Sequence, residues 1–264
     1  MIVDADWLAE HAKDANLALV DVRAPFFYAQ GHLPGAVNLP TVFLHGPQGP
    51  PDPQALARLL GRLGVTRDSH VVAYDDGASP DAARLYWVLT YYDHPQVSVL
   101  DGGATAWRHG GRDLEYMPAT PEPTTYEIGE PNRPVRANAE QVARAVHDAH
   151  AVVLDTRSPG EYLGVQAHPG ERAGHVPGAI NLDWSNNLTR DADDIARFKE
   201  RGELEDLYRA IGVEPDKDVY VYCQSGNRAS ETFLVLRALG YPHVALYSPG
   251  YSDWQADPSR EIAR

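Results

Sequence analysis

The chain has a single cysteine, Cys223, among its 264 residues. One cysteine excludes an intrachain disulfide and any metal site built from several cysteines. Free cysteine is among the most often buried residue types, so Cys223 taken alone is either an apolar core residue or a reactive thiol. The sequence on either side of Cys223 is needed to distinguish these two interpretations.

Long apolar runs and positive charge are also scarce. No stretch approaches the roughly 20 apolar residues of a membrane-spanning helix, so we expect no membrane partner. Asp4 and Asp6 stand where a secretory signal would be basic, which favours a cytoplasmic protein. The formal net charge of −14 argues against nucleic acid as the main partner. An anionic substrate would therefore have to be attracted by local geometry.

The sequence repeats itself once. Segment 19–25 (LVDVRAP) returns at 153–159 (VLDTRSP), and segment 31–39 (GHLPGAVNL) returns at 174–182 (GHVPGAINL). The offset between these matching segments rises from 134 to 143 residues. It is 148 between 70–75 (HVVAYD) and 218–223 (DVYVYC) and 147 between 99–107 and 246–254, so loop insertions separate the matches. The repeat predicts two copies of one domain, residues 1–115 and 135–264, joined by a Pro-rich linker over 116–134. We call these copies the first half and the second half.

Each half alternates short apolar runs with segments of helical periodicity. The predicted strands are Leu17–Val22, Val71–Tyr74, Val97–Leu100, Ala151–Leu154, Val219–Tyr222 and Val244–Tyr247. The predicted helices are Ala55–Leu63, Asp81–Tyr92, Ala139–His147 (with Asn138 as N-cap) and Ala229–Leu239. This alternation is typical of an α/β fold, here two tandem domains, each a mainly parallel sheet flanked by helices. Ligands in such sheets bind beyond the carboxyl ends of the strands.

Cys223 lies at the carboxyl end of one of these strands. The six-residue loop that leads into the next helix consists of Cys223, Gln224, Ser225, Gly226, Asn227 and Arg228. Backbone N–H groups in such a loop can converge into an anion-binding nest, to which the helix N-terminus adds partial positive charge. Arg228 adds a full charge, and Gly226 permits the backbone angles of a tight turn. These features favour the thiolate form, so the sequence predicts a reactive Cys223.

The combination of Asp-x-Arg, Gly-His-x-Pro-Gly-Ala-x-Asn-Leu and strand-Cys-loop-helix resembles the rhodanese domain over nearly the whole chain. The tandem arrangement is similar to that of thiosulfate and 3-mercaptopyruvate sulfurtransferases. The resemblance implies an inactive first half, in which Asp75 occupies the position of Cys223. It also implies that Cys223 takes the outer sulfur of thiosulfate as a persulfide and passes it to cyanide or a small thiol, without a metal or an organic cofactor.

The resemblance also suggests roles for other residues. The backbone N–H groups of Gln224 to Arg228 should stabilise the anionic sulfur, and the Arg228 side chain should hold the sulfonate of the donor or anchor the loop. Asp155 and Arg157 are expected to form a structural ion pair at a strand end. Glu161 replaces an arginine that contacts the donor in vertebrate relatives, and we hypothesise that it orients Arg228.

Three alternatives are weighed against thiosulfate sulfurtransferase. The Cys-x4-Arg spacing closes a tighter loop than the Cys-x5-Arg of dual-specificity phosphatases, which disfavours phosphatase activity. The basic Arg228 favours thiosulfate over 3-mercaptopyruvate, but Ser248-Pro249-Gly250-Tyr251 replaces the family's usual Asp-Gly-Ser-Trp and leaves donor preference open. A persulfide carrier or sensor that passes sulfur to a protein partner is the third alternative.

Overall fold

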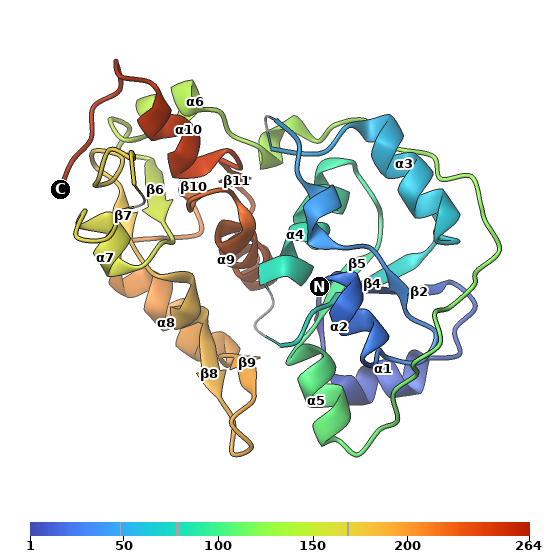
Figure 1. Cartoon of the computed structure of the whole chain (residues 1–264). Coiled ribbons are helices and arrows are strands. Elements are labelled where there is room, and N and C mark those ends of the chain that lie inside the picture. The colour runs from blue at the N-terminus through green and yellow to red at the C-terminus, as the bar shows by residue number, and fades with distance from the viewer. Residues whose placement is uncertain (48, 78–79, 168) are drawn as a thin grey trace. The chain divides into compact units, whose positions relative to one another are not determined.

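The computed structural model describes residues 1–47, 49–77, 80–167 and 169–264. Its contacts divide the chain into two compact α/β units, coloured from blue to red along the chain in Figure 1. The first unit contains Met1–Gly46, Pro50–Asn132 and Leu188–Phe198. The second contains Arg133–Asn187 and Lys199–Arg264, together with Pro47 and Gly49. The predicted fold class is confirmed.

The first unit is built on a five-stranded parallel sheet with strand order β1-β5-β4-β2-β3. Its strands are β1 (Ile2–Val3), β2 (Leu17–Asp21), β3 (Val37–Asn38), β4 (His70–Tyr74) and β5 (Val97–Leu100). Its helices are α1 (Ala5–His11), α2 (Pro25–Ala29), η1 (Thr41–Leu44), α3 (Pro53–Arg62), α4 (Pro80–Tyr91) and α5 (Gly103–His109).

The second unit repeats this plan with a four-stranded parallel sheet of order β11-β10-β6-β7. Its strands are β6 (Ala151–Asp155), β7 (Ile180–Asn181), β10 (Asp218–Tyr222) and β11 (Val244–Leu246). Its helices are η2 (Arg133–Val135), α6 (Ala139–Ala145), α7 (Pro159–Tyr162), η3 (Trp184–Asn187), α8 (Arg201–Ala210), α9 (Asn227–Leu239) and α10 (Gly250–Ala256).

The register of the central strands positions the site. Strands β6 and β10 are neighbours, and Asp155 lies opposite Tyr222 at their carboxyl ends. Arg157 and Cys223 follow these two residues closely in the sequence, so both lie at the same edge of the sheet. This is the edge where a parallel α/β sheet binds its ligands.

Asn138 caps helix α6, as its sequence predicted. Its side chain accepts a hydrogen bond from the Gln141 backbone N–H at 2.9 Å, and the Gln141 side chain accepts one from the Asn138 N–H at 2.9 Å. This reciprocal capping box satisfies two N–H groups that would otherwise lack partners at the helix start.

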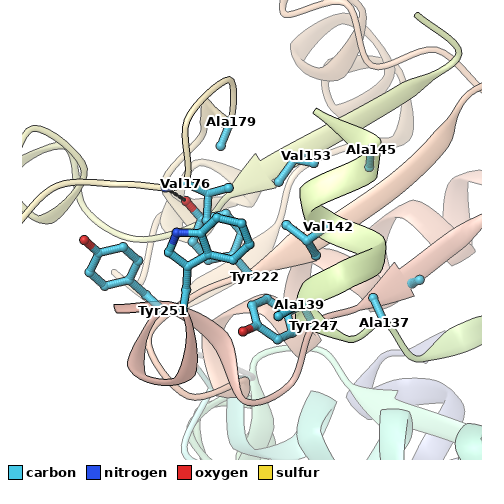
Figure 2. Close-up of a cluster of buried hydrophobic side chains, with 12 residues drawn as sticks. Ala137, Ala139, Val142, Ala145, Val153, Val176, Ala179, Tyr222, Tyr247 and Tyr251 are labelled. Carbon is cyan, nitrogen blue, oxygen red and sulfur yellow. Dashed lines mark hydrogen bonds between the residues drawn. The ribbon is translucent and has the colours of Figure 1, made fainter. Parts of the chain in front are cut away.

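A buried cluster of apolar side chains fills the second unit on the α6 side of its sheet, and Figure 2 shows how Tyr222, Val153 and Val142 pack together there. Tyr222 is fully buried, and its hydroxyl accepts a hydrogen bond from the Val176 N–H at 3.2 Å. Val176 belongs to the Gly-His-Val-Pro-Gly turn, so this bond ties that turn to β10 next to Cys223. The core therefore holds the strand end that carries the cysteine.

One element of the second half belongs to the first unit. Strands β8 (Leu188–Arg190) and β9 (Ala196–Phe198) form an antiparallel hairpin. The Phe198 N–H donates to the Asp101 carboxylate at 3.0 Å, and Arg197 Nη1 donates to the Asp101 carbonyl at 3.1 Å. No sequence pattern predicted this arrangement.

The Pro-rich segment also packs against the first unit. The Thr124 N–H donates to the Gly61 carbonyl at 2.8 Å, and the Thr124 hydroxyl donates to the Val65 carbonyl at 2.7 Å. Contacts therefore group this segment with the first unit as far as Asn132. Among the described residues, no helix is long and apolar enough to cross a membrane.

Candidate active site

Cys223 is held at the junction between β10 and α9. Its side chain is 2% exposed, and its sulfur accepts a hydrogen bond from the Gly226 N–H at 3.1 Å. Gly226 has φ of 98°, a left-handed conformation that favours glycine and turns the chain into the helix. Helix α9 begins at Asn227, two residues earlier than predicted, so Asn227 and Arg228 form its first turn. The positive end of this helix is directed at the sulfur.

The start of α10 closes the other side of the loop. The Tyr251 N–H donates to the Cys223 carbonyl at 2.8 Å, and the Ser252 N–H donates to the Gln224 carbonyl at 3.1 Å. Gly250 lets the two segments approach, since a Cβ on this residue would lie 2.4 Å from the Cys223 carbonyl oxygen. The backbone of the cysteine loop is thus fixed from both sides.

Arg228 and Glu161 form a bidentate ion pair. Arg228 Nη1 donates to Glu161 Oε2 at 2.7 Å, and Nη2 donates to Oε1 at 2.8 Å. Burial alone would raise the pKa of Glu161, but the bonds from Arg228 and Ser158 outweigh it and lower this pKa to about 2. The bond to Glu161 raises the pKa of Arg228, to which the nearby Cys223 sulfur also contributes. Glu161 therefore holds the positively charged Arg228 guanidinium near the Cys223 sulfur. This is the geometry expected if Glu161 orients Arg228.

Asp155 and Arg157 form the ion pair expected from the sequence, in almost complete burial. Arg157 is 2% exposed; its Nε and Nη2 donate to the Asp155 carboxylate at 2.7 to 3.1 Å, and Nη2 also donates to the Gly174 carbonyl at 2.8 Å. The Arg157 guanidinium carbon lies 3.8 Å from the centroid of the Tyr251 ring. This stacking comes from α10, and no local sequence pattern predicted it.

The remaining loop residues differ in their surroundings. Gln224 Nε2 donates to Glu171 Oε1 at 2.7 Å and to the Ser252 hydroxyl at 3.0 Å. Ser225 is exposed, and Asn227 is half-buried at the start of α9. Glu171 and Ser252 were not among the residues singled out from the sequence.

A pocket of about 550 Å³ opens beside the loop. The side chains with polar or aromatic groups that line it are Arg157, Glu161, Gln166, Glu171, Arg172, Gln224, Arg228 and Tyr251. Several of these come from segment 165–173, the insertion that raises the repeat offset from 134 to 143. Of this insertion the structure describes all but His168. The repeat comparison could have located this wall of the pocket, because the inserted residues have no counterpart in the first half.

The first half carries a carboxylate where the second half carries the thiol. Asp75 is 6% exposed, and its carboxylate accepts hydrogen bonds from the Gly77 N–H at 2.8 Å and the Ala82 N–H at 3.3 Å. The backbone N–H groups that follow Asp75 therefore already bind a carboxylate of the protein itself.

Comparison with known proteins identifies the class to which this fold and site belong. The profile of the rhodanese-like domain matches the chain twice, over residues 4–109 and 138–257. The chain is therefore a member of the rhodanese-like domain family, with two copies of the domain in tandem.

Three relatives align with 96% of this chain. The sulfur carrier protein TtuD of Thermus thermophilus is 33% identical, with 93% of its length covered. The thiosulfate sulfurtransferase of Corynebacterium glutamicum is 34% identical over 87% of its length, and the 3-mercaptopyruvate sulfurtransferase of Escherichia coli is 32% identical over 94%. The names of these relatives all describe sulfur transfer or sulfur carriage.

A solved structure matches as well. The anaerobic ergothioneine biosynthesis enzyme of Chlorobium limicola, solved with trimethyl histidine, has a TM-score of 0.87 and 25% identity. The match covers 99% of this chain and 69% of that enzyme. The shared fold thus also occurs in an enzyme whose substrate is an organic molecule.

Proposed function

We propose that this protein is a thiosulfate sulfurtransferase that moves the sulfane sulfur of thiosulfate to cyanide or a thiol through a persulfide on Cys223. The observation that carries the proposal is the position of Cys223 in the chain. Its thiol is buried, accepts the Gly226 N–H at 3.1 Å and lies at the start of a 13-residue helix. A backbone N–H at a helix start can stabilise the negative charge that the sulfur carries in the attack and in the persulfide.

The proposed reaction has two steps. The Cys223 thiolate attacks the outer sulfur of thiosulfate; a bond forms between the two sulfurs, and the outer sulfur's bond to the sulfonate group breaks to release sulfite. The terminal sulfur of the persulfide keeps the negative charge. Cyanide then attacks this terminal sulfur, leaves as thiocyanate and restores the thiolate. Splitting one transfer into two covalent steps gives ping-pong kinetics.

The Glu161–Arg228 pair supports both steps electrostatically. Each step keeps a negative charge on sulfur beside the Arg228 guanidinium, and Glu161 holds that group in place through two short bonds. A cation fixed before the reaction stabilises charge without reorganisation. Since Glu161 binds both terminal nitrogens of Arg228, we assign Arg228 to the sulfur and the loop rather than to the sulfonate of the donor.

We assign the chemistry to the second half alone. Asp75 offers no thiol, and its carboxylate already accepts the N–H groups of its loop. The first half is thus proposed to be inactive, with residues 1–115 as its domain.

Intact mass measurement tests the proposal. The protein is incubated with thiosulfate, freed of excess reagent and weighed beside Cys223→Ser. A gain of about 32 Da in the unaltered protein alone, removed by cyanide, is the expected signature of one sulfur on Cys223. Absence of any gain with thiosulfate contradicts the thiosulfate reaction.

A second candidate is 3-mercaptopyruvate as the donor. It is favoured by the pocket of about 550 Å³, which is far larger than a thiosulfate ion, and by the relative named for this activity. A mass gain with 3-mercaptopyruvate but not with thiosulfate supports it. A persulfide that is stable but turns over slowly with small acceptors supports sulfur delivery to a protein partner, as the name of the Thermus relative suggests.

A further inference from the structure

Three arginines line the pocket, and two of them have both terminal nitrogens bonded within the protein. Both terminal nitrogens of Arg228 bind Glu161. Those of Arg172 donate to backbone carbonyl oxygens, namely those of Gln255, Asp257 and Arg260. In each of these two residues both terminal nitrogens therefore already donate to an acceptor of the protein.

Arg157 differs from these two because one of its nitrogens is left over. Its Nε and Nη2 bind Asp155 and the Gly174 carbonyl, whereas Nη1 bonds to no residue that the structure describes. Although it has no such partner, Nη1 is not fully buried. Since Arg157 lines the pocket and is otherwise 2% exposed, Nη1 is the part of the side chain that the pocket can reach.

The first half contains the same arrangement in a closed form. Arg23 binds Asp21 with Nε at 3.0 and 3.1 Å and with Nη2 at 2.5 Å, and its Nη2 donates to the Gly31 carbonyl at 2.9 Å. Here Nη1 is occupied, because it donates to Asp76 at 2.9 Å. The repeat aligns Asp76 with Gln224, which turns instead to Glu171. One difference between the halves thus leaves the arginine open in the second.

Tyr251 holds the open arginine in place. The guanidinium carbon of Arg157 lies 3.8 Å from the centroid of its ring, whereas the repeat aligns Tyr251 with Ala104 in the first half. A guanidinium fixed by a carboxylate on one side and a ring on its face loses little freedom when it binds a ligand.

We propose that Nη1 of Arg157 binds the anionic head group of the sulfur donor, the sulfonate of thiosulfate or the carboxylate of 3-mercaptopyruvate. This inference rests on the proposed function. It assigns donor recognition to an arginine that the sequence presents as structural, and separates it from the sulfur-stabilising role of Arg228. Charge-assisted hydrogen bonds to an oxyanion suit a guanidinium nitrogen that has no acceptor within the protein.

Calorimetric titration of Cys223→Ser, which cannot form a persulfide, tests the inference with thiosulfate and, separately, with 3-mercaptopyruvate. In this background Gln224→Asp recreates the closed pair of the first half. We expect it to raise the Kd of the bound donor about tenfold or more over Gln224→Asn, which loses the same amide contacts without adding charge. The donor that binds identifies the head group.

Two further variants separate this bond from other effects. Gln166→Glu adds the same negative charge elsewhere on the pocket wall, and we expect a change of less than about threefold, as for a screened surface charge. Arg157→Lys keeps a cation for Asp155 but lacks the forked N–H, and we expect the Kd to rise about tenfold while circular dichroism shows that the fold is retained.

Equal effects of Gln224→Asp and Gln166→Glu would show simple repulsion and overturn the inference. Unchanged binding in Arg157→Lys, or no binding of either donor to Cys223→Ser, would also overturn it. The proposed function is judged independently, by persulfide formation in the unaltered protein.

Discussion

The two halves of this chain share a scaffold and differ at a few positions that determine its chemistry. Both hold an Asp-x-Arg fork at a strand end, with Nε to carboxylate distances of 3.0 and 3.1 Å in each. Asp75 stands in one half where Cys223 stands in the other. The sheet and the fork are therefore a shared scaffold, whereas the thiol, the Glu161–Arg228 pair and the inserted pocket wall of residues 165–173 belong to the second half.

Moving the thiol is the most severe test of this difference. We expect Asp75→Cys combined with Cys223→Ser to transfer sulfur at less than about a thousandth of the normal rate, because covalent catalysis fails when its supporting groups are missing. The first half has Phe27 in the position of Glu161 and lacks the inserted pocket wall. The rate of thiocyanate formation measures the effect. A substantial rate from the double variant would show that the loop alone suffices.

Loss of the Glu161 charge should have the next largest effect. Glu161→Gln removes the carboxylate that fixes Arg228, and we expect persulfide formation to slow about 10- to 100-fold through misplacement of the cation. Stopped incubation followed by mass measurement gives the rate, and circular dichroism checks that the fold is retained. Partial recovery in Glu161→Asp supports positioning, while an unchanged or faster rate in Glu161→Gln contradicts it.

The two halves also differ in the residue beside the arginine of the fork, which is Tyr251 in the second half and Ala104 in the first. Tyr251→Leu removes a ring that is 1% exposed, and we expect the unfolding free energy to fall by about 2 to 4 kcal/mol. Tyr251→Phe is the matched control, because it loses only the hydroxyl bond to the Arg172 carbonyl, worth about 1 kcal/mol. Urea denaturation compares them. Equal losses in both variants would mean that the ring contributes nothing beyond its hydroxyl.

The smallest effect concerns the dependence of stability on pH. Folding lowers the pKa of Glu161 from its ordinary 4.5 to about 2, so the Glu161–Arg228 pair stabilises the fold fully above about pH 4.5. That contribution fades as the pH falls towards 2. Urea denaturation at pH 6 and pH 3 should show a larger loss in the unaltered protein than in Glu161→Gln. Identical losses would mean that the pair does not contribute to stability.

Much of the fold could be predicted because its signals are local or repeated. The apolar runs of β2, β4, β6 and β10 and the capping residue Asn138 act within a few residues, and the repeat doubled the information. Strands β3 and β7 have only two residues each, too few for a periodicity to register. The start of α9 was placed too late because the left-handed turn at Gly226, not the first alanine, sets it.

The site was predictable only where neighbours in sequence build it. Cys223 and its loop follow from strand, glycine and helix. The partners Glu171 and Tyr251 reach the loop from a loop insertion and from α10, so their contacts depend on tertiary packing that no local pattern encodes. The Glu161–Arg228 bond spans 67 residues and could be raised only as a hypothesis from the resemblance.

The hairpin of residues 188–198 has a consequence for how the chain assembles. Synthesis runs from the N-terminus, so the first unit receives its final strands only after much of the second half has been made. Until then the half-buried Asp101 lacks both Arg197 and the Phe198 N–H. Burial raises the pKa of Asp101, and these partners oppose that rise. The first unit is therefore discontinuous along the chain, and no single cut separates two complete folding units.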